Sequence, residues 1–288
     1  RDCIVRECSS APNCVILHPN CCNAENTLTQ STVSFDHLLT IALLAFSTSI
    51  LGGMIGIGGA VILIPAFLIV PPLLGQPPMD MHAVSGITSV QVFASSLLGA
   101  VLHRQRGAFD MRVVLAIGIP LMLASFVGAQ LSGAVSAQFL EGLFAIVALA
   151  GAVLILASGH TAESTTYKLR YARAIGIAAP VGFFGGMVGM AGGFLLSPLM
   201  VTVLRIPIRI TIGSTLGIVI IGAFATALGK AIAGMIEPTT TAAAIIGALP
   251  GMWLGVHMSH RLHTGQLRAI IALVIGGIGL GMLIRVLH

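Results

Sequence analysis

Long apolar runs, interrupted by Gly, Pro or charged residues, fill the chain beyond position 35. Ten runs can be distinguished, at 36–55, 60–74, 82–102, 112–134, 137–158, 174–190, 192–204, 209–232, 239–259 and 266–287. A helix that crosses the hydrocarbon core of a bilayer needs about 20 apolar residues. Eight of the runs approach that length, whereas those at 60–74 and 192–204 are shorter. The pattern predicts an all-α polytopic membrane protein.

The composition agrees with that prediction. Hydrophobic residues make up 56% of the chain and charged residues only 8%, whereas soluble domains carry about 25% charged residues. The net charge of +5 does not indicate a nucleic-acid partner, because the 14 Lys and Arg residues are scattered singly between apolar runs. Basic residues in such positions report membrane orientation. The predicted macromolecular surroundings are therefore a lipid bilayer.

Positions 1–34 differ from the rest of the chain. They are polar, show no helical period and contain all five Cys residues: Cys3, Cys8, Cys14, Cys21 and Cys22. Outside the cytoplasm these thiols could form disulfides, although an odd number leaves at least one without an intrachain partner. Their wide spacing does not favour a zinc site. We predict an irregular extracytoplasmic segment, and the sequence indicates neither a metal site nor a cofactor.

Two glycine-rich segments reveal an internal repeat. The chain reads GGMIGIGGAVILIP from Gly52 to Pro65 and GGMVGMAGGFLLSP from Gly185 to Pro198, and further parallels follow each segment at similar spacing. This predicts a first transmembrane repeat at 35–160, a cytoplasmic linker at 161–173 and a second repeat at 174–288. Because each repeat holds five segments, an odd number, the second must enter the membrane from the opposite side and form an inverted repeat.

The basic residues test this topology. If all ten segments cross and the N-terminus is outside, ten of the fourteen basic residues face the cytoplasm, as the positive-inside rule requires. These are Arg104, Arg106, Arg112, Lys168, Arg170, Arg173, Arg205, Arg209, Arg261 and Arg268. The alternative topology has eight crossings, with 60–74 and 192–204 as re-entrant segments. It distributes the basic loops over both faces.

The glycine clusters are the first candidate solute site. Gly56, Gly58 and Gly59 precede one short segment, and Gly189, Gly192 and Gly193 precede the other. Glycine permits a break in a helix, and the helix that starts after the break offers free N–H groups and a positive dipole end to an anion. The alternative is close helix packing through small residues.

Polar residues on neighbouring segments could complete this site. The candidates are Thr88, Gln91, Ser214 and Thr215, together with Gln130 and His257, which occupy equivalent positions of the two repeats. The hydroxyl groups could equally bond to carbonyls of their own helices, and Gln130 and His257 could be interfacial. His103 and Lys230 also correspond across the repeats, near segment ends, where snorkelling to the interface explains them most simply.

The paired glycine motifs, with HAVSGITSV after the first and ITIGSTLGI after the second, resemble the sulfite exporter TauE/SafE family of membrane transporters over roughly 35–288. The resemblance implies a plasma-membrane transporter of the bacterial type for small anions such as sulfite or organosulfonates. The Cys-rich segment and Ala191, which replaces a Gly of the first motif, depart from the pattern.

Two other classes of function were compared with transport. An enzyme is not expected, because the apolar segments contain no catalytic constellation. A channel-like or sensory membrane protein, with the Cys-rich segment as a partner-binding element, is the alternative function. A homodimer is compatible with the sequence.

Overall fold

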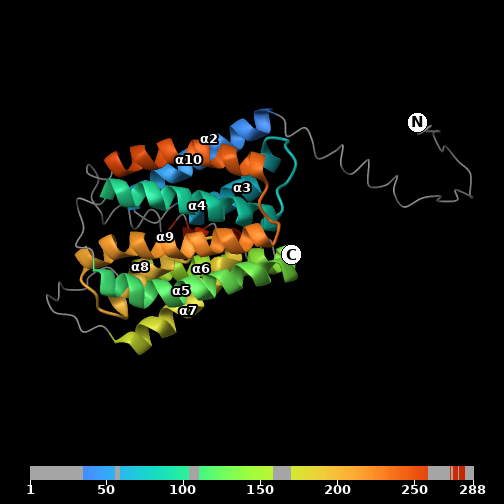
Figure 1. Ribbon diagram of the computed structural model, residues 1–288. Helices are drawn as coiled ribbons and strands as arrows, with labels where there is room; N and C mark the ends of the chain where they lie inside the picture. Colours follow the sequence, from blue (N-terminus) through green and yellow to red (C-terminus); the bar gives the residue numbers. More distant parts are fainter. Residues whose placement is uncertain are drawn as a thin grey trace, which may run out of the picture. The chain divides into compact units, whose positions relative to one another are not determined.

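The computed structural model describes residues 35–55, 59–103, 110–157 and 170–258, with isolated positions between 273 and 282. The Cys-rich segment, Gly56 and Gly58 lie outside the described residues. Described regular structure is entirely helical (Figure 1). The helices are α2 (Phe35–Ile55), α3 (Ala60–Leu73), α4 (Met81–His103), α5 (Met111–Leu131), the 3-10 turn η1 (Ser132–Ala134), α6 (Ala137–Ala157), α7 (Tyr171–Val188), α8 (Gly193–Thr202), α9 (Ile208–Ile232) and α10 (Pro238–Met258).

Nine of the ten predicted apolar runs thus correspond to one described α-helix each, and the tenth lies mainly outside the described residues. Seven of the described helices are long and apolar enough to cross a membrane, whereas α3 and α8 are shorter. The chain is therefore a polytopic all-α membrane protein, as predicted. Capping residues explain several boundaries. For example, the side chain of Asp110 accepts a hydrogen bond from the backbone N–H of Arg112 at the start of α5 (2.9 Å).

Contacts between helices establish that α2, α4 and α10 run in the same direction. The side chain of Gln76, just before α4, donates to Thr40 Oγ1 in the first turns of α2 (2.9 Å), and Gln91, in mid-α4, donates to Ser49 Oγ further along α2 (3.0 Å). Successive glycines of α10 pack on successive carbonyls of α2 in the same order. The pairs are Gly247 with Ala42, Gly251 with Phe46 and Gly255 with Ile50.

Helices α5, α7 and α9 run in the opposite direction. Gly182 and Gly186 of α7 pack on Leu121 and Ser125 of α5 in the same order, so α5 and α7 are parallel. Along α9, Gly222 and Gly229 meet Leu121 and Ala129 of α5, again in the same order. By contrast, α9 is antiparallel to α4, because the first turns of α4 meet the end of α9 and the end of α4 meets its start.

These directions distinguish the two predicted topologies. Because α2 and α4 are parallel, α3 must return the chain to the end of the bundle at which α2 began. Helix α8 must do the same between the parallel helices α7 and α9. A re-entrant segment would instead return to the end from which it entered. The arrangement therefore agrees with the ten-segment topology and contradicts the eight-crossing alternative.

Corresponding helices of the two predicted repeats make corresponding contacts. Helix α5 packs on α7 and α9, as α10 packs on α2 and α4, and α3 packs on α4 as α8 packs on α9. Figure 1 shows α2 beside α10 and α5 beside α7. Even single contacts recur, since Gly128 meets the Phe183 carbonyl as Gly255 meets that of Ile50. The repeats interleave, because each supplies helices that pack on the other.

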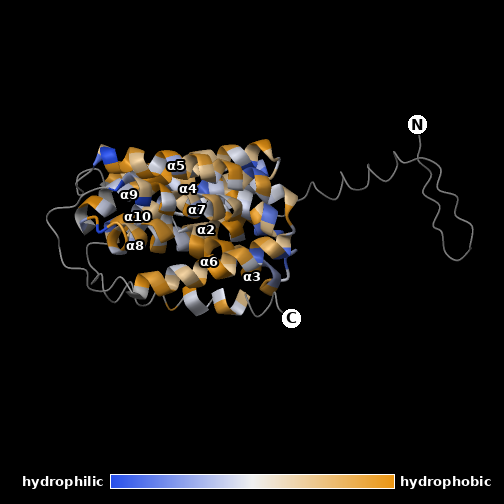
Figure 2. Cartoon of the chain, turned by 90° about the horizontal axis from the view of Figure 1, so that it is seen from below, coloured by the Kyte–Doolittle hydropathy of each residue, from blue (hydrophilic) through white to orange (hydrophobic). Residues whose placement is uncertain are grey.

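The two ends of the bundle differ in charge. Helices α2, α4 and α10 begin at one end, where Asp36, Asp80 and Glu237 lie at or just before their first turns. Helices α5, α7 and α9 begin at the other end, which carries Arg112, Arg170, Arg173 and Arg205. We call these the acidic end and the basic end. Figure 2 shows hydrophilic positions mainly towards the helix ends and hydrophobic ones between them.

Candidate functional site

The second glycine cluster breaks the chain between α7 and α8. Helix α7 ends in a Schellman motif, in which the N–H of Met190 donates to the Gly185 carbonyl (2.8 Å) and Gly189 has a φ of 91°. The chain then turns back along α7, so that Gly192 packs against Val181. Gly193 packs against Val219, near the middle of α9. Helix α8 therefore begins about half-way between the two ends of the bundle.

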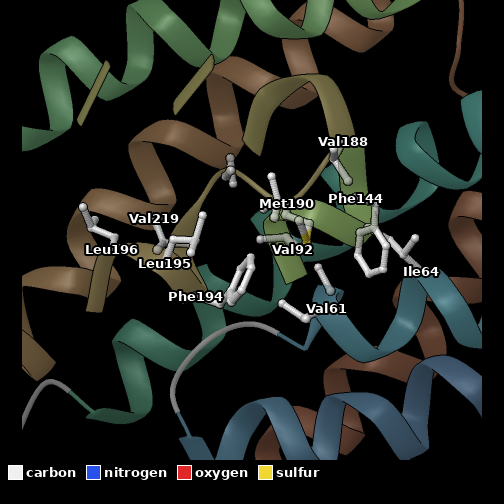
Figure 3. Packing of buried hydrophobic residues seen from close by; sticks show 14 of the residues in the cluster. Val61, Ile64, Val92, Phe144, Val188, Met190, Phe194, Leu195, Leu196 and Val219 are labelled. Atoms are coloured by element: carbon white, nitrogen blue, oxygen red, sulfur yellow. The ribbon is translucent and has the colours of Figure 1, made fainter. Parts of the chain in front are cut away.

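The first glycine cluster has an equivalent arrangement where it is described. Gly59 has a φ of 75° and precedes α3, next to Thr48 and Ser49 of α2. The Gly59 carbonyl accepts the first hydrogen bonds of α3, from the N–H groups of Ile62 and Leu63 (both 3.2 Å). The N–H groups before the first bonded ones have no acceptor within the helix, as at any helix start. Both short helices thus begin after a left-handed glycine, as the sequence predicts. Equivalent residues of these first turns, Val61 and Phe194, project into the same buried cluster (Figure 3).

The two helix starts differ in the side chains at equivalent positions of the neighbouring helices. Near α3, Gln91 Nε2 donates to Ser49 Oγ and to Ser95 Oγ, both at 3.0 Å. All three residues are buried, and Gln91 Oε1 has no hydrogen-bond partner. The equivalent positions beside α8 are Gly182, Ile218 and Gly222, which offer no polar side chain. We call Ser49, Gln91 and Ser95 the central polar cluster; it lies at mid-height in the bundle.

The hydroxyl candidates have local roles. Thr88 Oγ1 donates to the Val84 carbonyl (2.8 Å) and Thr215 Oγ1 to the Thr211 carbonyl (2.6 Å), each within its own helix. Such back-bonding is the alternative that the sequence left open. Ser214 Oγ accepts from the backbone N–H of Asp110 (3.3 Å). It therefore ties the start of α9 to that of α5 at the basic end, away from the central polar cluster.

Gln130 and His257 do not join that cluster either. Gln130 lies half-buried in the last turn of α5, at the acidic end, and His257 lies exposed in the last turn of α10, at the basic end. The ring Nδ1 of His257 is 2.8 Å from the Trp253 carbonyl of its own helix. The two residues are equivalent in the repeats, but inversion places them at opposite ends. The two side chains therefore do not meet at one site, and a solute contact of either stays a prediction.

Lys230 corrects a second expectation. Its side chain does not snorkel to the interface but is fully buried in α9, in contact with α4, η1 and α7. The ammonium Nζ donates to Ser85 Oγ (2.8 Å), Ser132 Oγ (2.6 Å) and the Met187 carbonyl (2.9 Å). A pattern in the sequence could have revealed this. Gly222, Thr226 and Lys230 form a small and polar stripe at four-residue spacing, whereas Phe224, Leu228 and Ile232 form an exposed apolar one.

Interleaved helices, two short helices that start at mid-height and a buried polar cluster beside one of them are features of helical membrane transporters. Residues 41–282 match the family model described as sulfite exporter TauE/SafE. The chain belongs to this family.

Curated relatives support the same class. A probable membrane transporter of Methanocaldococcus jannaschii is 24% identical over 88% of this chain and 98% of its own length. The probable membrane transporter YdhB of Bacillus subtilis is 26% identical over 82% of this chain and 96% of its length. A probable membrane transporter of Xylella fastidiosa is 24% identical over 78% and 84%, respectively. No solved structure matches the chain.

Proposed function

We propose that this protein is a secondary transporter or facilitator that exports a small sulfur-containing anion, such as sulfite or an organosulfonate, across the plasma membrane. The observation that carries the proposal is the central polar cluster, buried at mid-height beside the start of α3 in a chain of this transporter family. A solute that crosses the bilayer must pass this level, and Gln91 is the residue of the cluster that has a buried polar atom without a hydrogen-bond partner.

Gln91 is the principal solute contact in this proposal. One atom of its carboxamide has no partner, although the group is fully buried. A half-turn of the carboxamide exchanges its oxygen and nitrogen, and the two serine hydroxyls can then donate to the oxygen instead of accepting from the nitrogen. The free atom is then the nitrogen, which offers N–H donors to an anion. The unpaired N–H groups at the start of α3 add a positive dipole end.

The charge of the two ends supports an orientation. Cytoplasmic ends of membrane helices are enriched in Lys and Arg, so the basic end would face the cytoplasm. The acidic end, where α2 begins, would then face outward together with the N-terminus. Alternating exposure of the centre to the two ends, by movement of one interleaved set of helices against the other, would move the anion.

Flux into proteoliposomes tests this function. The full-length protein is reconstituted and supplied with sulfite, sulfate, thiosulfate and small sulfonates, with and without a proton gradient. We expect flux of at least one sulfur-containing anion above that of empty liposomes. Absence of flux for every anion from a folded, correctly inserted protein would refute the proposal.

Matched substitutions test the site. Gln91→Leu should lower flux at limiting solute about 10- to 100-fold, because a hydrogen bond to a charged group contributes about 1.5–3 kcal/mol and 1.4 kcal/mol corresponds to a factor of ten. Gln130→Leu makes the same chemical change at the end of α5 and should leave flux within about twofold of the parent. Equal effects of the two substitutions would exclude Gln91 as the solute contact.

A further inference from the structure

The buried Lys230 carries an amino group that has no part in the proposed central site. Each of its two hydroxyl partners already donates its hydrogen to a carbonyl of its own chain segment. Ser85 Oγ donates to the His82 carbonyl (2.8 Å) and Ser132 Oγ to the Ala129 carbonyl (2.6 Å). Both hydroxyl oxygens can therefore accept a hydrogen bond from Nζ, as the Met187 carbonyl oxygen does. A protonated ammonium can donate one N–H to each of these three acceptors, at 2.6–2.9 Å.

This positive charge has only neutral partners among the described residues. Besides the three oxygens, the thioether sulfur of Met235 lies 3.7 Å from Nζ. The acidic groups on the adjoining segments bond elsewhere, since Asp80 accepts from the N–H of His82 and Glu237 from the hydroxyl of Thr240. An ionised side chain within the bilayer is costly and calls for a counter-charge or a function. An anion is the partner that this ammonium lacks.

Lys230 also joins the two predicted repeats near the acidic end of the bundle. Ser85 and Ser132 belong to the first repeat, whereas Met187 and Lys230 belong to the second. Around this junction the backbones touch, since Gly189 packs on the Ser85 carbonyl and Gly86 on the Met235 carbonyl. No side chain could be accommodated at either glycine. A solute that left the centre between these segments would require the contacts to separate, and the ammonium bridges them.

We propose that Lys230 is an anion-responsive latch, which holds the acidic end closed and binds the transported anion as its counter-ion when that end opens. The inference rests on the proposed transport of an anion. An anion attracts the ammonium through its opposite charge, an attraction that the neutral serine and carbonyl acceptors do not supply. An arriving anion can therefore replace one or two of the serine and carbonyl acceptors and release the bridge between the repeats. Removal of the anion to the outside restores the three neutral acceptors and closes the end.

Thiol accessibility tests the latch without any need for flux. The tail cysteines are replaced by Ser in the full-length chain, and a single reporter is introduced as Thr226→Cys. Thr226 is buried one helical turn before Lys230, on the same face of α9. Its reaction with a small uncharged maleimide is followed in detergent, where both ends are open to solvent. Methanesulfonate is the probe anion, because sulfite itself reacts with thiol reagents, and gluconate is the bulky control.

We expect Lys230→Met to increase the labelling rate about tenfold, which corresponds to about 1.4 kcal/mol, and Lys230→Arg to increase it less. Methanesulfonate should accelerate labelling of the Lys230 protein, gluconate should not, and the acceleration should disappear in Lys230→Met. Ser132→Ala should increase labelling, whereas Ser96→Ala, which also removes a buried hydroxyl bonded within its own helix, should not. If Lys230→Met fails to fold, the comparison of Ser132→Ala with Ser96→Ala still tests the latch.

Two results would overturn the latch. One is equal labelling in Lys230→Met, Ser132→Ala and the parent. The other is an acceleration by methanesulfonate that persists undiminished in Lys230→Met. Neither depends on transport. Flux with labelling that is indifferent to Lys230 would refute the latch alone, and responsive labelling without flux of any anion would refute the proposed function alone.

Discussion

The contact between α2 and α10 leads to a quantitative prediction about glycine. Every fourth residue over three turns of α10 is a glycine that packs on an α2 carbonyl, and Gly251 lies at the centre of this row, on Phe46. A Cβ at Gly251 would overlap the carbonyl group itself, which no change of rotamer can relieve. The substitution Gly251→Ala must therefore push the two helices apart.

The magnitude follows from two opposing contributions. Alanine stabilises a helix interior by roughly 0.5–1 kcal/mol relative to glycine, whereas forcing extra atoms into a packed interface costs about 1–3 kcal/mol. Gly176→Ala is the matched control, since Gly176 is an exposed glycine of α7 with nothing within 4 Å of its Cβ position. Gly176→Ala has the helix stabilisation of alanine but no overlap of its Cβ with another helix. The two variants should thus differ by about 1–3 kcal/mol in stability.

Thermal denaturation of the purified protein in detergent measures this difference. For a unit of this size, 1 kcal/mol shifts Tm by about 2–4 °C, so Gly251→Ala should denature about 2–12 °C below Gly176→Ala. The contact between α5 and α7 supplies an independent check, because Gly186→Ala should behave alike on the Ser125 carbonyl. If Gly251→Ala and Gly176→Ala have the same Tm, the backbone contact described for α2 and α10 is not present in the membrane protein.

Two further predictions concern topology and the break before α8. Single cysteines at Gln76 and Gly234 should react with an impermeant reagent from one side of sealed vesicles and a cysteine at Arg205 from the other; reaction of the first two from opposite sides would contradict the parallel course of α2 and α4. Ala191 has a φ of 51°, a conformation that costs a non-glycine residue roughly 1–2 kcal/mol, so Ala191→Gly should raise Tm. Gly189→Ala should lower Tm, because the new Cβ would be strained at a φ of 91° and would overlap the Ser85 carbonyl. A Tm change of the opposite sign in either variant would contradict the described break.

The helices themselves could be predicted because apolar length and Gly or Pro boundaries are local properties. The run at 60–74, for example, agrees with α3 (Ala60–Leu73) within a residue. The path of the chain was not decided by length, because a short apolar segment can either cross or return. Contacts between distant residues, such as Gln76 with Thr40, decided it. Lys230 was misjudged for a similar reason, since proximity to a helix end says nothing about which face of the helix is packed inside.

Inversion also determines which repeat-related residues can share a site. A residue near the end of one helix and its equivalent in the other repeat lie at opposite ends of the bundle, as Gln130 and His257 do. Only residues near mid-height can approach their equivalents, as Val61 and Phe194 do in the buried core. Equivalence is therefore evidence for a common site only at the centre. There the repeats have diverged, with Gln91 in one and Ile218 in the other, so that a fold built from paired halves carries its central polar cluster on one half only. The same divergence distinguishes the two ends of the bundle, because the acidic end has the buried Lys230 and the equivalent residue at the basic end is His103. The two ends therefore need not open by the same chemistry.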